Sequence, residues 1–325
     1  MKKIVGIILF TLFVMFPLCA QHALFLPKEH KQSTGDWLRW SVSADSGMFF
    51  GMLYEYVFIA RDSDGQYNDT LSRLDWQLNP LVYCGFSLDA ELFHDFTLGL
   101  GTWLGIPALL GYMEDRDWDA NNGDYISFSH HDNFLIDAVF VDFNIGYNVI
   151  NTDSFVLVPL LGFNYKHFRM AGRDGYQEQP PGSVPNTLSG ELITYEQNYY
   201  IPYVGVKTFW SPVQLLSLQF FACYSPMVFG FNIDNHLHPS VRADYIDVPL
   251  WGNYLSVDIV VYLNFMNDWS LKLHAGYMYI SKFKGDIYAR LIYLGSNDYV
   301  QSSSSRGGAS LQLLNVSLGV VFDIL

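Results

Sequence analysis

Residues 96–118 read FTLGLGTWLGIPALLGYMEDRDW, and this run decides what kind of fold the chain has. Large apolar residues alternate along it with small ones. One face carries Phe96, Leu98, Leu100, Leu104, Ile106, Leu110 and Tyr112, and the other carries Thr97, Gly99, Gly101, Gly105 and Gly111. A period of two is that of a β-strand. An apolar face opposite small residues is typical of a transmembrane barrel strand, with lipid outside and a crowded lumen inside.

Similar runs recur along the whole chain. The ten expected strands lie near 38–60, 71–93, 96–118, 133–150, 154–172, 194–210, 213–236, 245–266, 269–291 and 308–325. The last of them alternates as clearly as the third. An even number of strands closes an antiparallel sheet on itself and leaves no open edge. We therefore predict an all-β fold, a ten-stranded antiparallel transmembrane β-barrel, in one domain over residues 21–325.

The connections alternate between short and long. Short turns are expected at 94–95, 151–153, 211–212 and 267–268, and long polar loops at 61–70, 119–132, 173–193, 237–244 and 294–308. Barrels of the outer membrane have short periplasmic turns and long external loops. A membrane strand needs only about 9–11 residues, and several runs have roughly twice that. The excess should stand above the membrane on the long-loop side.

Residues 1–20 have the features of a secretory signal. Two lysines at positions 2 and 3 precede an uncharged apolar stretch at 4–16, and Ala20 offers a small residue for cleavage. A membrane-spanning helix is one alternative, but the stretch is shorter than the roughly 20 residues a span needs. A lipoprotein site at Cys19 is another, although the two residues before it are not small.

The composition agrees with a barrel. The chain is 50% hydrophobic and only 15% charged, which is unusual for a soluble protein. Its net charge of -14 argues against a nucleic-acid partner and suits cationic partners. Two cysteines follow the signal, Cys84 and Cys223, and being isolated they indicate neither a metal site nor a disulfide framework.

Two carboxylates continue the lumen face of the third run upward. Asp115 and Asp117 share the parity of its glycines, so both should point inward. They follow the turn at 94–95 by about 20 residues, which at roughly 3.3 Å per residue and a tilt near 45° is about 45 Å of height. A hydrocarbon core is about 30 Å thick. The pair should therefore stand outside the membrane.

The seventh run reaches the same height with Asp234 and His236. Its upper apolar face puts Asn232, Asp234 and His236 inward, but the same parity would turn Leu216, Leu218 and Phe220 into the lumen. A β-bulge near residues 224–226 would repair this, and Pro226 is a residue expected at one.

The third and seventh strands of a ten-strand barrel face each other across the lumen. A carboxylate can orient an imidazole, which can then take a proton from water as a general base. Facing carboxylates can hold that water and stabilise the tetrahedral species. The plain alternative is a set of solvated charges at a barrel rim, which is common.

Several motifs give the chain a resemblance to a known family. They are SRLDW at 72–76, MEDRDW at 113–118, the segment 129–132, PYVG at 202–205 and the run 224–256. Together they resemble the omptin family, the outer-membrane aspartate–histidine endoproteases. The resemblance covers most of the mature chain.

The resemblance implies roles for particular residues. It puts Asp115 with Asp117, and Asp234 with His236, on the two catalytic pairs of the family. A register with His238 as the catalytic histidine would need a gap. His130 and Asp132 are expected to shape the cleft from a loop.

Two features depart from the family pattern. Omptins hold a basic P1 side chain with two acidic residues. Glu55 resembles the first, but the second falls on Asn232, which has no charge, so cleavage after or between Lys and Arg residues is expected with a relaxed preference. Omptins bind lipopolysaccharide through basic residues on the outer wall. The matching positions here look like His167 and Asn198, which carry no fixed positive charge, and this weakens the expectation of lipopolysaccharide activation.

The resulting hypothesis is an outer-membrane endopeptidase whose site faces the cell exterior. Asp234 would polarise His236, His236 would deprotonate the attacking water, and Asp115 with Asp117 would position it. Peptide or protein substrates, an outer-membrane lipid and a monomeric state are expected, and no metal or cofactor is implied. The alternatives are a non-catalytic adhesin or binder and a small pore, although a ten-strand lumen should be filled with side chains.

Overall fold

The computed structural model describes residues 38–324 except 62–64, 94, 239–241 and 267. The signal expected at residues 1–20 lies outside these residues. The strands are β1 (Leu38–Ile59), β2 (Asp69–Leu92), β3 (Phe96–Gly105), β4 (Leu109–Trp118), β5 (Tyr125–Tyr147), β6 (Ile150–Asn151), β7 (Phe155–Glu178), β8 (Asn186–Val213), β9 (Leu216–His236), β10 (Ala243–Asn264), β11 (Trp269–Arg290), β12 (Val300–Gln301) and β13 (Ser305–Ile324), with a 3-10 turn, η3 (Ile292–Leu294). No helix among the described residues has the length and apolar character needed to cross a membrane.

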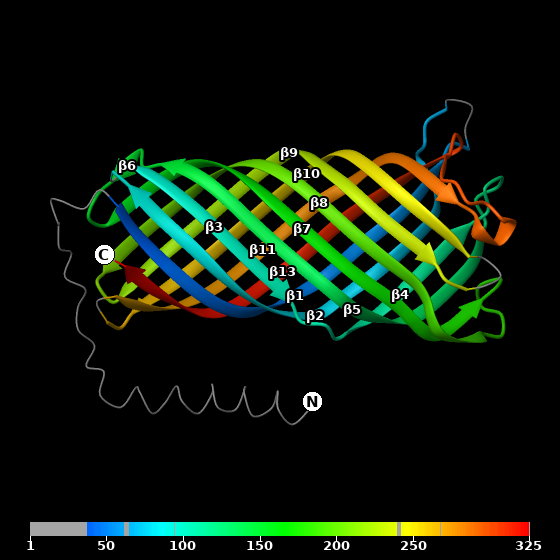
Figure 1. Ribbon diagram of the computed structural model, residues 1–325, viewed down its shortest axis with the longest axis horizontal. Coiled ribbons are helices and arrows are strands. Elements are labelled where there is room, and N and C mark those ends of the chain that lie inside the picture. Colours follow the sequence, from blue (N-terminus) through cyan, green and yellow to red (C-terminus); the bar gives the residue numbers. More distant parts are fainter. Residues whose placement is uncertain (1–37, 62–64, 94, 239–241, 267, 325) are drawn as a thin grey trace, which may run out of the picture.

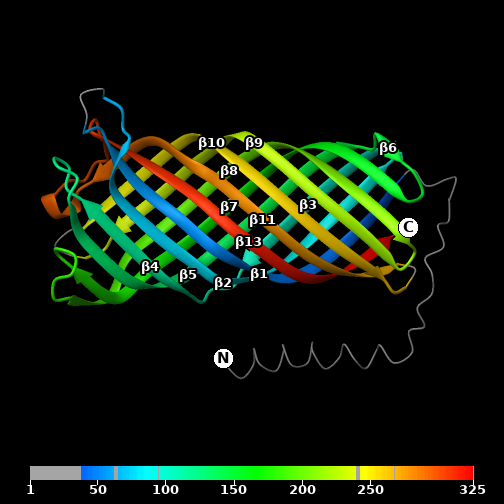
Figure 2. The ribbon, with the colours of Figure 1, turned by 180° about the vertical axis from the view of Figure 1, so that it is seen from behind.

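The sheet closes into a barrel (Figures 1 and 2). The first strand, β1, pairs with β2 on one side and with β13 on the other, from Trp40 opposite Ile324 to Ile59 opposite Ser305. Both β3 and β4 lie between β2 and β5, and they are counted below as one interrupted strand of the barrel. With the two-residue strands β6 and β12 set aside, ten long antiparallel strands form the ring in the described chain. The predicted fold class is confirmed.

Three strands rise higher than the sequence predicted. The strand expected at 133–150 begins at Tyr125, and the loop expected at 173–193 shrinks to the connection between Glu178 and Asn186. The reason is physical. Above the membrane the outer face of a strand meets water and the inner face carries buried polar side chains, such as Ser127 and Ser129, so the alternation of apolar and polar residues on which the prediction depended fades.

The third strand of the ring, made of β3 and β4, is interrupted where the sequence predicted continuous alternation. Residues 106–108 are not strand, and the β4–β5 register shifts between Leu109 and Gly111. Pro107 has no N–H to give to a ladder. The expectation that Leu110 faces lipid is wrong, because its side chain is fully buried. The inward parity of the glycines of β3 is nevertheless regained at Met113, which is 1% exposed.

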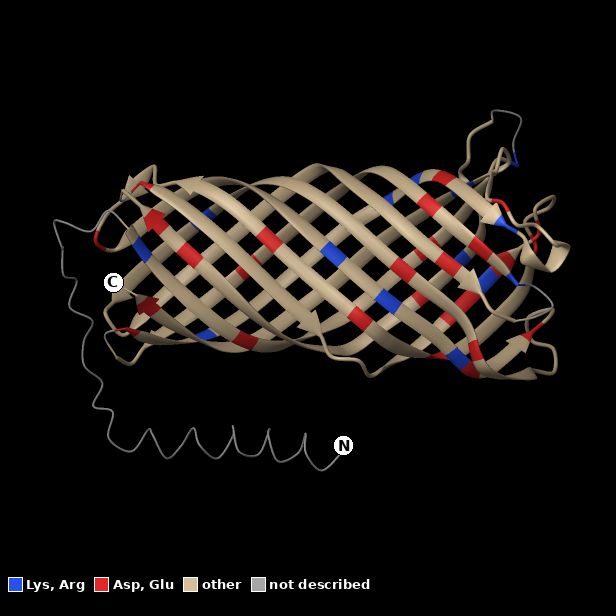
Figure 3. Ribbon diagram, in the orientation of Figure 1, with Lys and Arg blue, Asp and Glu red and all other residues tan. Residues whose placement is uncertain are grey.

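The wall and the lumen differ as the barrel requires. Large apolar side chains cover the outside, among them Phe86, Leu161 and Ile259. Fully buried side chains from strands all around the ring fill the inside, including Leu53, Trp76, Leu81, Phe168 and Leu311. Charged residues are denser toward the end of the barrel away from the C-terminus, where the long loops lie (Figure 3). This filled lumen supports the site at that end from below.

Candidate active site

The end of β9 presents a carboxylate and an imidazole to the lumen. His236 Nε2 lies 2.8 Å from Asp234 Oδ2. Asp234 is 5% exposed, whereas the ring of His236 is partly open. The ring of Tyr245, on β10, stands edge-on to the imidazole with 5.3 Å between centroids. A buried carboxylate thus fixes one ring nitrogen, and the rest of the imidazole stays accessible.

The predicted bulge in β9 is what turns this pair inward. Below it Cys223 and Ser225 are buried, and above it Val228 and Asn232 are buried, so the inward parity changes from odd to even. Pro226 and Met227, between the two series, both face outward. The Ser225 hydroxyl accepts a hydrogen bond from the Met227 amide at 3.0 Å. With this extra residue, the apolar lower part of β9 faces lipid and its polar top faces the lumen.

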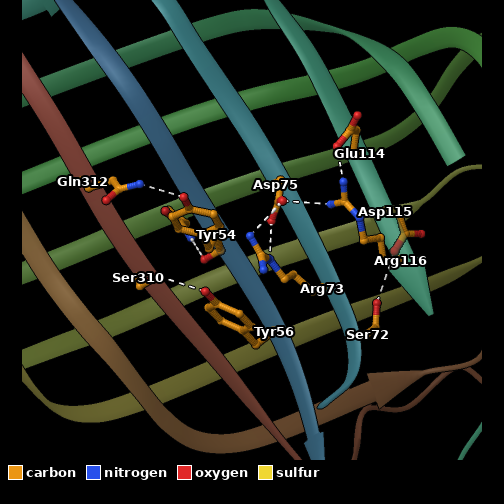
Figure 4. Close-up of polar contacts among 11 residues, drawn as sticks. Tyr54, Tyr56, Ser72, Arg73, Asp75, Glu114, Asp115, Arg116, Ser310 and Gln312 are labelled. Atoms are coloured by element: carbon orange, nitrogen blue, oxygen red, sulfur yellow. Dashed lines mark hydrogen bonds and ion pairs between the residues drawn. The ribbon is translucent and has the colours of Figure 1, made fainter. Parts of the chain in front are cut away.

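Asp115 and Asp117 lie near the top of β4. The Ser72 hydroxyl of β2 donates to Asp115 Oδ1 at 3.3 Å (Figure 4). On the opposite face of the same strands, Asp75 accepts hydrogen bonds from Arg73 and Arg116, and Arg116 also contacts Glu114 (Figure 4). This outer chain of ion pairs ties β4 to β2 and so fixes the height of the inward carboxylates.

The two pairs act on one another electrostatically across the lumen. Burial raises the pKa of Asp115 well above its ordinary value, and the charge of Asp117 raises it further. Burial likewise raises the pKa of Asp117. Two carboxylates that interact in this way do not both ionise readily, so retention of a proton by the pair is favoured. Burial lowers the pKa of His236, but the carboxylates of Asp234, Asp115 and Asp117 outweigh it and bring the pKa to about 9.

Glu55 and Asn232 lie in the same region, and both are almost fully buried. Glu55 is 2% exposed and Asn232 is 1% exposed. Burial raises the pKa of Glu55 well above its ordinary value, and the charges of Asp234, Asp247 and Asp115 add to this. Leu74 of β2 lies directly opposite Glu55 of β1 on one side and opposite Asp115 of β4 on the other. The two acidic residues are therefore at the same level of the sheet, two strands apart.

Asp247 was not expected from the sequence. It lies on β10 directly opposite Asn232 and is 2% exposed. Burial raises its pKa well above the ordinary value, and Asp234 raises it further. The sequence offered one signal for Asp247: it lies two residues from Tyr245 and therefore on the same face of the strand. That signal was weak because Asp247 falls next to an expected loop, where an aspartate is read as a solvated charge.

The profile of the Omptin family matches residues 38–324. The chain belongs to this family. Omptins are outer-membrane barrels, and the end that carries the long loops and these acidic residues faces the cell exterior.

Comparison with solved structures supports the fold through one of the two matches described here. The outer membrane protease OmpT from Escherichia coli superimposes with a TM-score of 0.77 at 21% identity, over 88% of this chain and 97% of that chain. The translocator domain of the autotransporter NalP from Neisseria meningitidis covers 91% of this chain, but its TM-score is 0.31 at 10% identity. Comparison with curated proteins found no match.

His130 and Asp132 are placed differently from the expectation. Both lie on β5 and not in a loop, and their side chains lie on the outer face. The ring of His130 stacks between Tyr112 and Tyr176 at 5.3 and 5.6 Å between centroids. The inward positions of this omptin strand are Ser127, Ser129, His131 and Asn133, all buried. The one-residue difference decides which face a strand residue occupies.

Three further positions bear on the resemblance. His238 lies beyond the end of β9, outside the hydrogen-bonded strand that carries His236. His167, on β7, lies 2.6 Å from Asp137 and 2.9 Å from Asn198 Oδ1. At these two positions the outer wall has an imidazole and an amide, neither of which carries a fixed positive charge, and the carboxylate of Asp137 lies beside the histidine.

Proposed function

We propose that this omptin is an endopeptidase that cleaves peptide bonds outside the cell, with a water molecule as the nucleophile. The observation that carries the proposal is the Asp234–His236 pair at 2.8 Å, held opposite Asp115 and Asp117 at the open end of the barrel. An imidazole fixed by a buried carboxylate and facing acidic groups has the arrangement of a general base.

The steps follow from the charges. His236, when neutral, takes a proton from the water, and Asp234 stabilises the resulting imidazolium. The water oxygen attacks the peptide carbonyl. A carboxylate pair that retains one proton can donate it in a hydrogen bond to the oxyanion as the tetrahedral species forms. His236 then gives its proton to the leaving amine as the bond to nitrogen breaks.

The acidic interior supports a preference for basic side chains. Glu55 is buried close enough to Asp234 and Asp247 for their charges to raise its pKa. A cationic substrate side chain entering this region would relieve that repulsion. The closed ring leaves no unpaired long strand in the described chain, so we also expect the enzyme to act as a monomer.

The test is cleavage of a quenched peptide with an Arg-Arg or Arg-Lys bond by the refolded barrel. We expect His236→Ala to lower kcat by about 10²–10⁴, the usual contribution of a general base. Asp244→Asn is a suitable control, because Asp244 pairs with Arg290 on the outer side of β10. Equal and negligible cleavage by wild type and His236→Ala would overturn the protease proposal and favour a non-catalytic surface binder.

A further inference from the structure

The buried acidic region below the catalytic pairs contains a neutral residue where a second carboxylate was expected. Asn232 is 1% exposed, and neither its amide nitrogen nor its amide oxygen has a hydrogen-bond partner among the described residues. A buried polar group without a partner is costly. Asn232 therefore cannot provide charge for a cation, and it gains nothing from its neighbours in the unoccupied protein.

We propose that Asp247 supplies the second carboxylate of the pocket for a cationic substrate side chain, with Glu55 as the first. The inference rests on the proposed function and names a residue that decides its specificity. Asp247 is the direct cross-strand partner of Asn232. Side chains of such partners lie on the same face with Cβ atoms about 5 Å apart. The charge is thus moved by one strand, from β9 to β10.

The side chain of Asp247 extends toward the strand that pairs with Glu55. A Cβ added to Gly307 of β13 would lie 2.2 Å from Asp247 Oδ1, so only glycine leaves room for the carboxylate there. Gly307 is two residues from Ala309, which pairs with Glu55. Asp247 therefore crosses β11 in the direction of Glu55, and the two carboxylates approach the same space from different strands.

The carboxyl groups of this region lack partners within the described chain. Glu55 Oε2, Asp234 Oδ1 and Asp247 Oδ1 are buried without hydrogen-bond partners in the described chain. No described lysine or arginine forms an ion pair with Glu55 or Asp247. A buried carboxylate without a partner is costly in its charged form, which is why burial raises the pKa of Glu55 and of Asp247. A ligand that brings a positive charge removes that cost.

The walls of the region suit a flat cation. Trp76 and Tyr195 are fully buried and stack with 5.7 Å between ring centroids and 16° between planes. The charges of both Glu55 and Asp247 act on Tyr195. Among the described residues, no group of three or more His, Cys, Asp or Glu side chains has the arrangement of a metal site. A guanidinium, whose planar fork of N–H groups donates to two carboxylates at once, suits a pair of acidic side chains better than a compact ammonium does.

The experiment compares wild type, Asp247→Asn, Asn232→Asp and the double variant on peptides with arginine or citrulline at P1. Citrulline has the shape of arginine without its charge. We expect Asp247→Asn to lower kcat/KM for arginine by about 10- to 100-fold, the effect of one lost hydrogen bond to a charged group. The citrulline peptide should change less than about twofold, and the double variant should regain the preference for arginine.

A second arm does not depend on cleavage. Binding of agmatine, which carries a guanidinium but no peptide bond, is measured calorimetrically in the His236→Ala background. Asp247→Asn should weaken binding by about 10-fold, and Asp244→Asn should not. An unchanged ratio of arginine to citrulline, or agmatine binding that ignores Asp247, would overturn this inference even if the enzyme is a protease. Absence of cleavage by wild type with intact agmatine binding would remove only the proposed function.

Discussion

His236 holds its proton more tightly than a free histidine because three carboxylates surround it. Its pKa is about 9, although burial alone would lower it. A general base must be neutral before it can act. At neutral pH most of the imidazole is therefore protonated, and the fraction that can accept a proton grows as the pH rises toward 9.

We predict that kcat/KM rises with pH along a limb governed by His236. In Asp234→Asn the strongest of the three acidic influences is gone, so the limb should move to lower pH while its plateau falls by about 10²-fold or more. The measurement is a pH–rate profile of both proteins on the same peptide. A limb at the same pH in both proteins would show that Asp234 does not act on the base, and Asp244→Asn should keep the wild-type profile.

At the scale of elements, the bulge in β9 is the feature on which the site depends. Without it, the parity that buries Ser225 would continue upward and turn Asn232, Asp234 and His236 toward the outside. A slip of one residue moves every side chain of a strand to the other face. The extra residue lets one strand turn its apolar side chains toward lipid in the lower half and its polar side chains toward the lumen in the upper half.

We predict that deletion of Met227 lowers cleavage by about 10³-fold, because it turns His236, the proposed general base, away from the lumen. Pro226→Ala should stay within about twofold, because an outward-facing bulge residue needs no ring. Insertion of one alanine after Phe229 in the deletion variant should restore activity. Folding is followed by heat-modifiable mobility in gels. Full activity of the deletion variant with a folded barrel would contradict this role of the bulge.

At the scale of the whole molecule, the ring is a scaffold that is closed in the middle. Side chains from opposite walls, such as Leu53 of β1 and Phe168 of β7, are fully buried in one core. A ten-strand barrel is narrow enough for side chains to fill it. The core separates the acidic residues at the outer end from a polar cavity nearer the C-terminus, lined by Asp45, Asp142 and Lys166 among others.

We predict that the folded barrel gives no steady conductance in a planar bilayer, because the core leaves no continuous aqueous path. A porin reconstituted in the same way provides the positive control, and gel mobility verifies insertion of the folded protein. A stable open channel would revive the alternative of a small pore and would mean that the core opens in the membrane.

The sequence by itself determined the barrel and its direction. Alternation in residues 96–118, the repeated spacing of turns and the parity of Asp115 and Asp117 needed only local geometry, because a strand has a period of two whatever surrounds it. The same reasoning located the bulge near Pro226. Local alternation was also what misplaced Leu110, since an interruption at residues 106–108 leaves no trace in the spacing of apolar residues.

Only the tertiary structure decided which side chains share the cleft. His130 and Asp132 lie on the outer face of β5, which begins at Tyr125, and the sequence does not reveal that start because both faces of the strand carry polar side chains there. Asp247 lies with Glu55 and Asn232 because of the register between paired strands, and the sequence alone does not give that register. The register between strands is set by the closure of the whole ring. For that reason the sequence predicted the two facing pairs from their heights alone, whereas the grouping of Asp247 with Glu55 and Asn232 came only from the structure.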